Sequence, residues 1–151
     1  TQMYDGVVIQ NILGTPQANF YPESGSCIQT NIPELKEYKI VHAKVDGRCM
    51  MVLGNKNGKY DKLIFRFNSR YSKYDIRTVE DVQIFELNFV TLENGVIAHI
   101  NEDENLELFG ISGDQIKIVE SNVISSDMKL SKRGTQVIFS KSNEVYTLKM
   151  K

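Results

Sequence analysis

Apolar and polar residues alternate over short stretches along the whole chain, and Gly, Asn, Asp and Ser separate these stretches. The alternation has the two-residue period of a strand, and β-branched and aromatic residues fill it. Residues 32–37 are the exception, because Pro33 suits the first position of a single helical turn. The pattern predicts an all-β protein with strands at 6–13, 17–21, 26–30, 38–45, 48–54, 62–67, 75–80, 87–92, 96–100, 106–111, 115–120, 128–131, 135–140 and 144–150.

The predicted strands recur as a unit. Each unit has a strand, a turn closed by glycine, a strongly apolar second strand, a short polar loop and a third strand, and the two middle units add a fourth. Asp-Gly and Asn-Gly pairs favour type I′ hairpins, because both central residues of that turn need positive φ. Three of the four turns carry such a pair, and their glycines are Gly6, Gly47, Gly95 and Gly134.

Four antiparallel strands that repeat at roughly 40 to 50 residues resemble the blades of a β-propeller. The resemblance implies tandem four-stranded antiparallel meanders that form a partial or split β-propeller, with residues 1–151 as a single β-repeat domain of about four blade units. It is a resemblance of pattern, since the chain has no Trp and no kelch or calcium-repeat signature. A β-sandwich with similar hairpins is the alternative architecture.

The units at the two ends look incomplete. Only four residues precede the turn at Gly6, so the first unit is expected to lack its innermost strand, and the last unit to lack its outermost strand. Apolar sheet faces left open in this way need cover. We therefore expect a portion of a larger propeller, or a subunit whose open faces another chain covers, so that the isolated chain is not self-sufficient.

The charge balance argues against a long-range electrostatic partner. Lys and Arg number 18 against 19 Asp and Glu, which gives a net charge of −1 and disfavours a nucleic-acid partner. No apolar run approaches the ~18 residues that span a bilayer, and no secretion signal is present. Cys27 and Cys49 do not form a short-spaced pair, which is typical of free thiols in a reducing compartment. We expect a soluble chain in the cytoplasm or in an intracellular assembly.

The residues that could carry chemistry are scattered. His42 and His99, with the two cysteines, are possible zinc donors, but they lie on separate strands without the local spacing of a metal site. Residues 101–105 are acidic yet lack the glycine and distal glutamate of a calcium loop, and residues 55–59 lack the spacing of a phosphate loop. No serine lies in a nucleophile elbow. The sequence predicts no cofactor, no metal and no catalytic residues.

The most distinctive surface candidate is the segment 66–77, in which basic residues alternate with tyrosines. Such a segment can stack on bases or bind an acidic partner, since Arg and Tyr are frequent at binding hot spots. Alternatively, its tyrosines pack on their own sheet and its cations stay solvated. The predicted partner-binding residues are Arg66, Arg70, Tyr71, Lys73, Tyr74 and Arg77.

Three functions follow as hypotheses. The first is a non-catalytic interaction scaffold or structural component that presents inter-strand loops to a protein partner or to the remainder of the propeller. The second is a ligand-binding or hydrolytic propeller whose site lies at the central channel, where strands 38–45, 87–92 and 128–131 converge. The third is nucleic-acid contact through the Arg66 to Arg77 hairpin.

Overall fold

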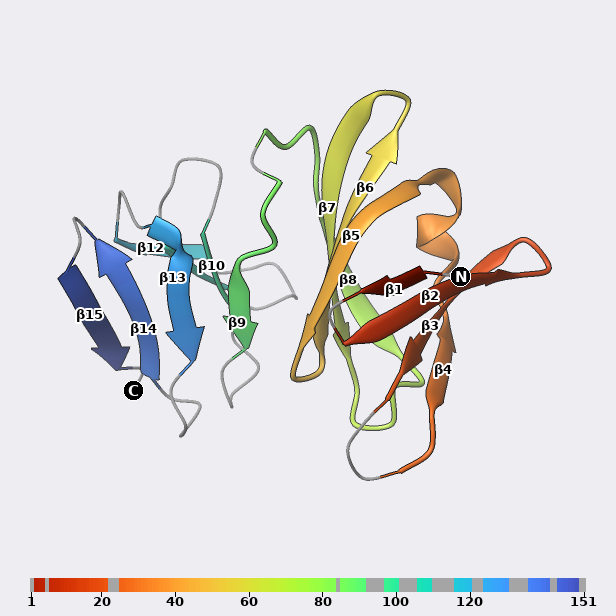
Figure 1. Ribbon diagram of the computed structural model, residues 1–151, viewed down its shortest axis with the longest axis horizontal. Helices are drawn as coiled ribbons and strands as arrows, with labels where there is room; N and C mark the ends of the chain where they lie inside the picture. The colour runs from red at the N-terminus through yellow and green to blue at the C-terminus, as the bar shows by residue number, and fades with distance from the viewer. Residues whose placement is uncertain are drawn as a thin grey trace. The chain divides into compact units, whose positions relative to one another are not determined.

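The computed structural model describes residues 2–4, 6–21, 25–83, 85–91, 97–100, 106–109, 116–120, 124–130, 136–141 and 144–149. These residues form four antiparallel sheets and one short 3-10 helix, which confirms the all-β prediction (Figure 1). The strands of each sheet pair in chain order, so every sheet is a meander. The chain groups into two compact units, Thr1–Val82 and Gln83–Lys151. Among the described residues, no helix has the length and apolar character needed to cross a membrane.

The first sheet has four strands, which corrects the prediction that its innermost strand is absent. Residues Gln2–Tyr4 pair with the start of the next strand, through a tight turn that contains Gly6 at φ 86°. Three residues before a tight turn are too few for a periodic pattern to reveal. The strands are β1 (Gln2–Tyr4), β2 (Val7–Ile12), β3 (Thr15–Phe20) and β4 (Ile28–Asn31).

The second sheet also has four strands, and the predicted helical turn precedes it as the 3-10 helix η1 (Pro33–Glu37). Its first turn differs from the predicted type. Asp46 pairs with Cys49, so the two central residues are Gly47, at φ 59°, and Arg48. Glycine at the first central position is the requirement of a type II′ turn, not of an Asp-Gly type I′ turn. The strands are β5 (Lys39–Asp46), β6 (Cys49–Lys56), β7 (Lys59–Phe67) and β8 (Tyr74–Val79).

The core of the first unit lies between these two sheets, which pack face to face. The Gly6 turn fits closely against β5, because a Cβ placed on Gly6 would lie 3.2 Å from the Cβ of Val45. Burial of this apolar surface is the main stabilising term of such a layer. The core contains Val7, Ile9, Ala18 and Phe20 from the first sheet, Ala43, Met50, Val52, Leu63, Phe65 and Phe67 from the second, and Ile32 and Leu35 around η1.

The second sheet is buried on both of its faces along β6 and β7. Met51, Leu53 and Ile64 alternate with the core residues of these strands and are at most 1% exposed. Their presence explains why residues 49–53 and 63–65 form continuous apolar runs in place of the alternation of a half-exposed strand.

The second unit contains two further sheets. Strands β9 and β13, the first strands of these two sheets, contact each other. The turns of Gly95 and Gly134 fall outside the described residues, between the first and second strands of their sheets. The last sheet has three described strands, the number predicted for it. The strands are β9 (Phe89–Thr91), β10 (Ile97–Ile100), β11 (Leu106–Phe109), β12 (Ile116–Glu120), β13 (Ile124–Leu130), β14 (Gln136–Lys141) and β15 (Glu144–Lys149).

Gly54 of β6 provides a test of this packing. A Cβ at this position would lie 2.7 Å from Cδ1 and 2.9 Å from Cγ of the Tyr38 ring. We expect Gly54→Ala to lower the free energy of unfolding by about 1–3 kcal/mol, the usual cost of overpacking. Chemical denaturation measures the change, and the same substitution in a Tyr38→Ala background is the control. An equal cost in both backgrounds would show that the ring is not the cause.

Candidate functional site

The loop between β7 and β8 is held in one conformation by the side chain of Asn68. Its Oδ1 accepts hydrogen bonds from the backbone N–H groups of Ser72 and Lys73, at 2.9 and 3.4 Å, and its Nδ2 donates to Ser72 Oγ at 3.0 Å. Its own N–H donates to the Lys73 carbonyl at 2.9 Å, and Tyr71, at φ 58°, donates its N–H to the Asn68 carbonyl at 3.1 Å. These local hydrogen bonds therefore preorganise the loop, in the way that Asn side chains order tight turns.

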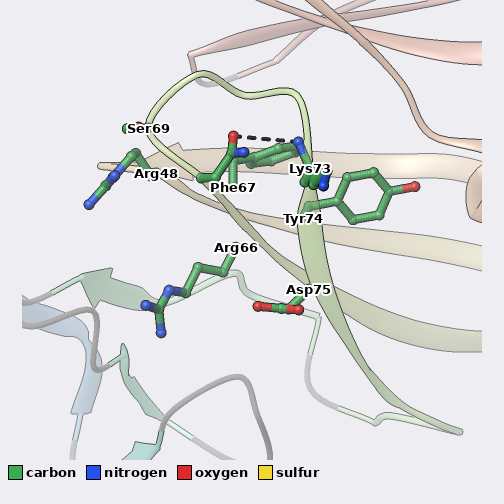
Figure 2. Close-up of a pocket in the computed structure, with 8 residues that line it drawn as sticks. Arg48, Arg66, Phe67, Ser69, Lys73, Tyr74 and Asp75 are labelled. Carbon is green, nitrogen blue, oxygen red and sulfur yellow. Dashed lines mark hydrogen bonds between the residues drawn. The ribbon is translucent and has the colours of Figure 1, made fainter.

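A depression of about 430 Å³ lies beside this loop (Figure 2). Arg48 reaches it from the β5–β6 turn, Arg66 from the end of β7 and Lys73 from the loop. Asp75 is the one acidic side chain in its lining. The three cations are exposed, and among the described residues none of them lies within ion-pairing distance of a carboxylate. We call this surface the cationic depression; its lining is Arg48, Arg66, Phe67, Asn68, Ser69, Lys73, Tyr74 and Asp75.

Of the six residues predicted for partner binding, the structure brings Arg66, Lys73 and Tyr74 together at the depression. Arg70 is exposed on the same loop. Arg77 is half-buried within β8, where it pairs with Ile64, and it does not line the depression.

The sequence analysis missed Arg48, although a signal for it existed. In a meander, the start of the second strand lies beside the end of the third, and here the Phe67 N–H donates to the Arg48 carbonyl at 2.8 Å. A cation in the β5–β6 turn was therefore expected to lie near cations at the end of β7.

Tyr71 and Tyr74 are half-buried and pack against the edge of the core. The Tyr71 ring lies 5.0 Å from Phe20 of the first sheet and 5.6 Å from Phe67, measured between centroids. The Tyr74 ring lies 5.5 Å from Phe67, and its hydroxyl donates to Glu34 of η1. Burial and this carboxylate raise the pKa of Tyr74 above its usual range. The two tyrosines therefore pack at the core edge, whereas Arg66, Arg70 and Lys73 are exposed.

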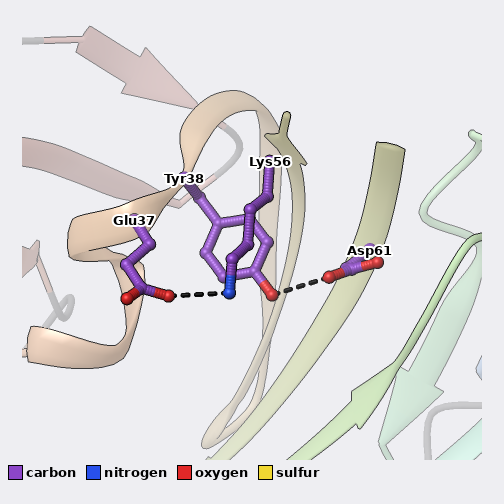
Figure 3. Close-up of polar contacts among 4 residues, drawn as sticks. All are labelled: Glu37, Tyr38, Lys56 and Asp61. Carbon is purple, nitrogen blue, oxygen red and sulfur yellow. Dashed lines mark hydrogen bonds and ion pairs between the residues drawn. The ribbon is translucent and has the colours of Figure 1, made fainter. Parts of the chain in front are cut away.

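A second polar cluster, at the other end of β6, joins η1 to the second sheet (Figure 3). The Tyr38 hydroxyl donates to Asp61 Oδ2 at 2.7 Å, and the Asp81 N–H donates to Asp61 Oδ1 at 2.9 Å. Lys56 Nζ lies 2.7 Å from Glu37 Oε2 and 5.7 Å from the centre of the Tyr38 ring. Both oxygens of Asp61 and the charge of Lys56 have partners. The cluster thus holds the chain in place, and we assign it no catalytic role.

The remaining candidates do not converge. His42 lies edge-on to Tyr4 with 6.0 Å between ring centroids, whereas His99 is buried with its Nδ1 3.8 Å from Glu107 Oε2. Cys27 is exposed and Cys49 buried, both as free thiols. The described residues contain no group of three or more His, Cys, Asp or Glu placed to hold a metal. The acidic stretch 101–105 lies outside the described residues, and 55–59 forms the β6–β7 hairpin.

Comparison with known proteins gives no relative from which a role can be transferred. No family model, curated protein or solved structure matches the chain. The functional argument therefore depends on the surface chemistry of the described residues.

The Asn68 bonds make the loop testable. We expect Asn68→Ala to lower the free energy of unfolding by about 1 kcal/mol, because the lost hydrogen bonds are exposed to water. Amide hydrogen exchange at Ser72 and Lys73 should accelerate in the same variant. Ser69→Ala, which removes an exposed hydroxyl with no protein partner in the described residues, is the matched control. Unchanged exchange in Asn68→Ala would contradict the assigned role.

The Tyr38–Asp61 bond predicts an alkaline loss of stability. Burial and the neighbouring Asp61 carboxylate raise the pKa of Tyr38 to about 12, from 10.0 for an unperturbed phenol. Because the unfolded chain ionises this phenol first, its contribution to stability is complete below pH 10.0 and is lost as the pH rises towards about 12. Between pH 10 and about 12, the free energy of unfolding, measured by denaturation, should therefore fall less steeply for Tyr38→Phe than for the wild-type chain. Parallel losses would contradict the assignment.

Proposed function

We propose that this chain is a non-catalytic interaction scaffold that binds an acidic segment of a protein partner at the cationic depression. The observation that carries the proposal is the set of exposed cations Arg48, Arg66, Arg70 and Lys73, without ion pairs among the described residues. Arg70 and Lys73 lie on a loop that is already ordered, and Arg48 and Arg66 reach the depression from beside it. A preorganised loop loses little conformational entropy when a partner binds. Complementary charge steers association and selects the partner.

Two features support a blade-like arrangement of the sheets within each unit. Every sheet is a sequential meander, and in both units the first strand of one sheet contacts the first strand of the next: β1 with β5, and β9 with β13. On this proposal the β7–β8 loop is an inter-strand loop at the rim of a blade.

A protein partner fits these residues better than a nucleic acid does. Sequence-tolerant binding of single strands needs aromatic faces on which bases stack. The Tyr71 and Tyr74 rings already pack against phenylalanines and do not offer such faces. Nucleic-acid contact through the Arg66 to Arg77 hairpin is thus the less favoured alternative. The channel site of a ligand-binding or hydrolytic propeller involves strands from both units and stays a prediction.

The charges set a limit on the expected affinity. Exposed ion pairs contribute about 0.2–1 kcal/mol each, so four of them supply about 1–4 kcal/mol. That range is enough for selectivity but not for tight binding. The depression is therefore expected to orient a partner that also makes contacts elsewhere.

A synthetic peptide tests the proposal. We expect a fluorescent peptide with alternating Glu and Ser residues to bind the chain, and the variant R66Q/R70Q/K73Q to bind it at least fivefold more weakly. Fluorescence anisotropy at low ionic strength measures both affinities, and added salt should weaken wild-type binding because the charges are exposed. The matched control is K36Q/K39Q/K59Q, which makes the same charge change at exposed lysines outside the cationic depression.

Three results would count against the proposal. An equal loss of affinity in the two triple variants would show that only the net charge matters. Retention of full affinity by R66Q/R70Q/K73Q would exclude the depression as the contact. Tighter binding of a single-stranded oligonucleotide than of the peptide, lost in the same variant, would assign the surface to nucleic acid.

A further inference from the structure

The β2–β3 hairpin has an unusual turn for its sequence. Ile12 pairs with Thr15, which leaves Leu13 and Gly14 as the central residues, at φ 52° and 83°. Positive φ at both positions is the type I′ geometry, which favours Asn, Asp or Gly and disfavours a bulky residue such as leucine.

The β6–β7 hairpin gives the comparison within the same chain. Its central residues, Asn57 and Gly58, have φ 54° and 85°, so the two turns have nearly the same φ values. The second turn uses Asn, the residue that this geometry accepts. Leucine at position 13 is thus not a requirement of the hairpin.

Leu13 also contributes no packing to its own fold. Its exposure is 102%, the largest of the exposed apolar side chains in the described residues, and Ile12 beside it is 46% exposed. A leucine that strains the backbone and is fully exposed to water lowers stability without a compensating contact in the monomer. We define Ile12 and Leu13 as the apolar knob.

An apolar hollow lies at the opposite end of the same sheet. Val7, which starts β2, pairs with Phe20, whereas Ile12 and Thr15 close the ladder at the knob (Figure 1). The hollow has a volume of about 360 Å³, and two residues on its rim, Met3 and Tyr21, are 81% and 62% exposed. Its lining is Met3, Tyr4, Gly6, Val7, Val8 and Tyr21.

We infer that the apolar knob of one copy of this chain binds in the apolar hollow of a second copy. Both elements lie on the first sheet, and the described residues that line the hollow carry no charge. Residues 6–22 contain no charged residue at all, so no like-charge repulsion along β2 and β3 opposes the contact. A lipid surface fits less well, since residues 6–22 themselves contain no Lys, Arg or Trp to engage head groups.

The contact joins two different surfaces. It closes into a two-fold dimer where each knob enters the other copy's hollow, and it otherwise produces open chains or rings. The knob and the hollow share no residue with the cationic depression. The inference is thus independent of the acidic-partner proposal, and either can fail alone.

Two variants separate the halves of the contact. Leu13→Asn removes the knob and places the favoured residue in the turn, so we expect this variant to unfold at a higher temperature than the wild-type chain and yet to lose self-association. Met3→Glu places a charge on the rim of the hollow at a highly exposed position. Sedimentation velocity from micromolar to near-millimolar concentration measures association, and thermal unfolding monitors the fold.

The expected result has three parts. The wild-type chain forms species that grow with concentration, each variant alone stays monomeric, and an equimolar mixture of the two variants forms a dimer, because one intact knob and one intact hollow remain. A wild-type chain that is monomeric throughout this range would overturn the inference. So would a mixture that fails to pair, since the knob would then bind another surface. Asn57→Asp, a polar change in the matched turn, should leave association unchanged.

Discussion

The face-to-face packing of the first two sheets, centred on Phe20, Phe65 and Phe67, is the interaction on which the other features of the first unit depend. Phe20 comes from one sheet and the other two rings from the second, with centroids of Phe20 and Phe67 4.9 Å apart. The ring of Tyr71, in the β7–β8 loop, packs against both Phe20 and Phe67 and so fixes the position of the loop against the core. The Tyr71 ring thereby packs at the core edge, whereas Arg70 and Lys73 of the loop are exposed to solvent.

Two polar devices extend this packing to the edges of the second sheet. At one end, Asn68 satisfies backbone N–H groups that the β7–β8 loop would otherwise expose. At the other, Asp61 receives both the Tyr38 hydroxyl and the Asp81 N–H, which joins η1 and the end of β8 to β7. In both places a short polar side chain accepts a hydrogen bond from a backbone N–H group, because strand ends leave such donors unpaired. Order at the edges is therefore local, while the core holds the sheets together.

Much of this arrangement was predictable from the sequence, and what was not has identifiable causes. Alternation and β-branched or aromatic residues located most strands, and Pro33 located the helical turn, whereas β1 is too short to alternate. Gly47 indicated a turn, but the turn type depends on a one-residue difference in the pairing of β5 with β6. Segment 66–77 was found by composition; which of its side chains are exposed depends on contacts with Phe20 and Glu34, distant in sequence. Arg48 required the strand order before it could be placed.

The two proposed surfaces differ in their physical basis, and this difference bears on how an assembly could use them. Charge at the cationic depression acts over a Debye length, about 8 Å at physiological salt, and can orient a partner before contact. The apolar knob acts only at contact, since burial of apolar area has no comparable reach. Because one surface selects and the other joins copies, a chain that carries both can repeat along an assembly while each copy presents the same cationic loop.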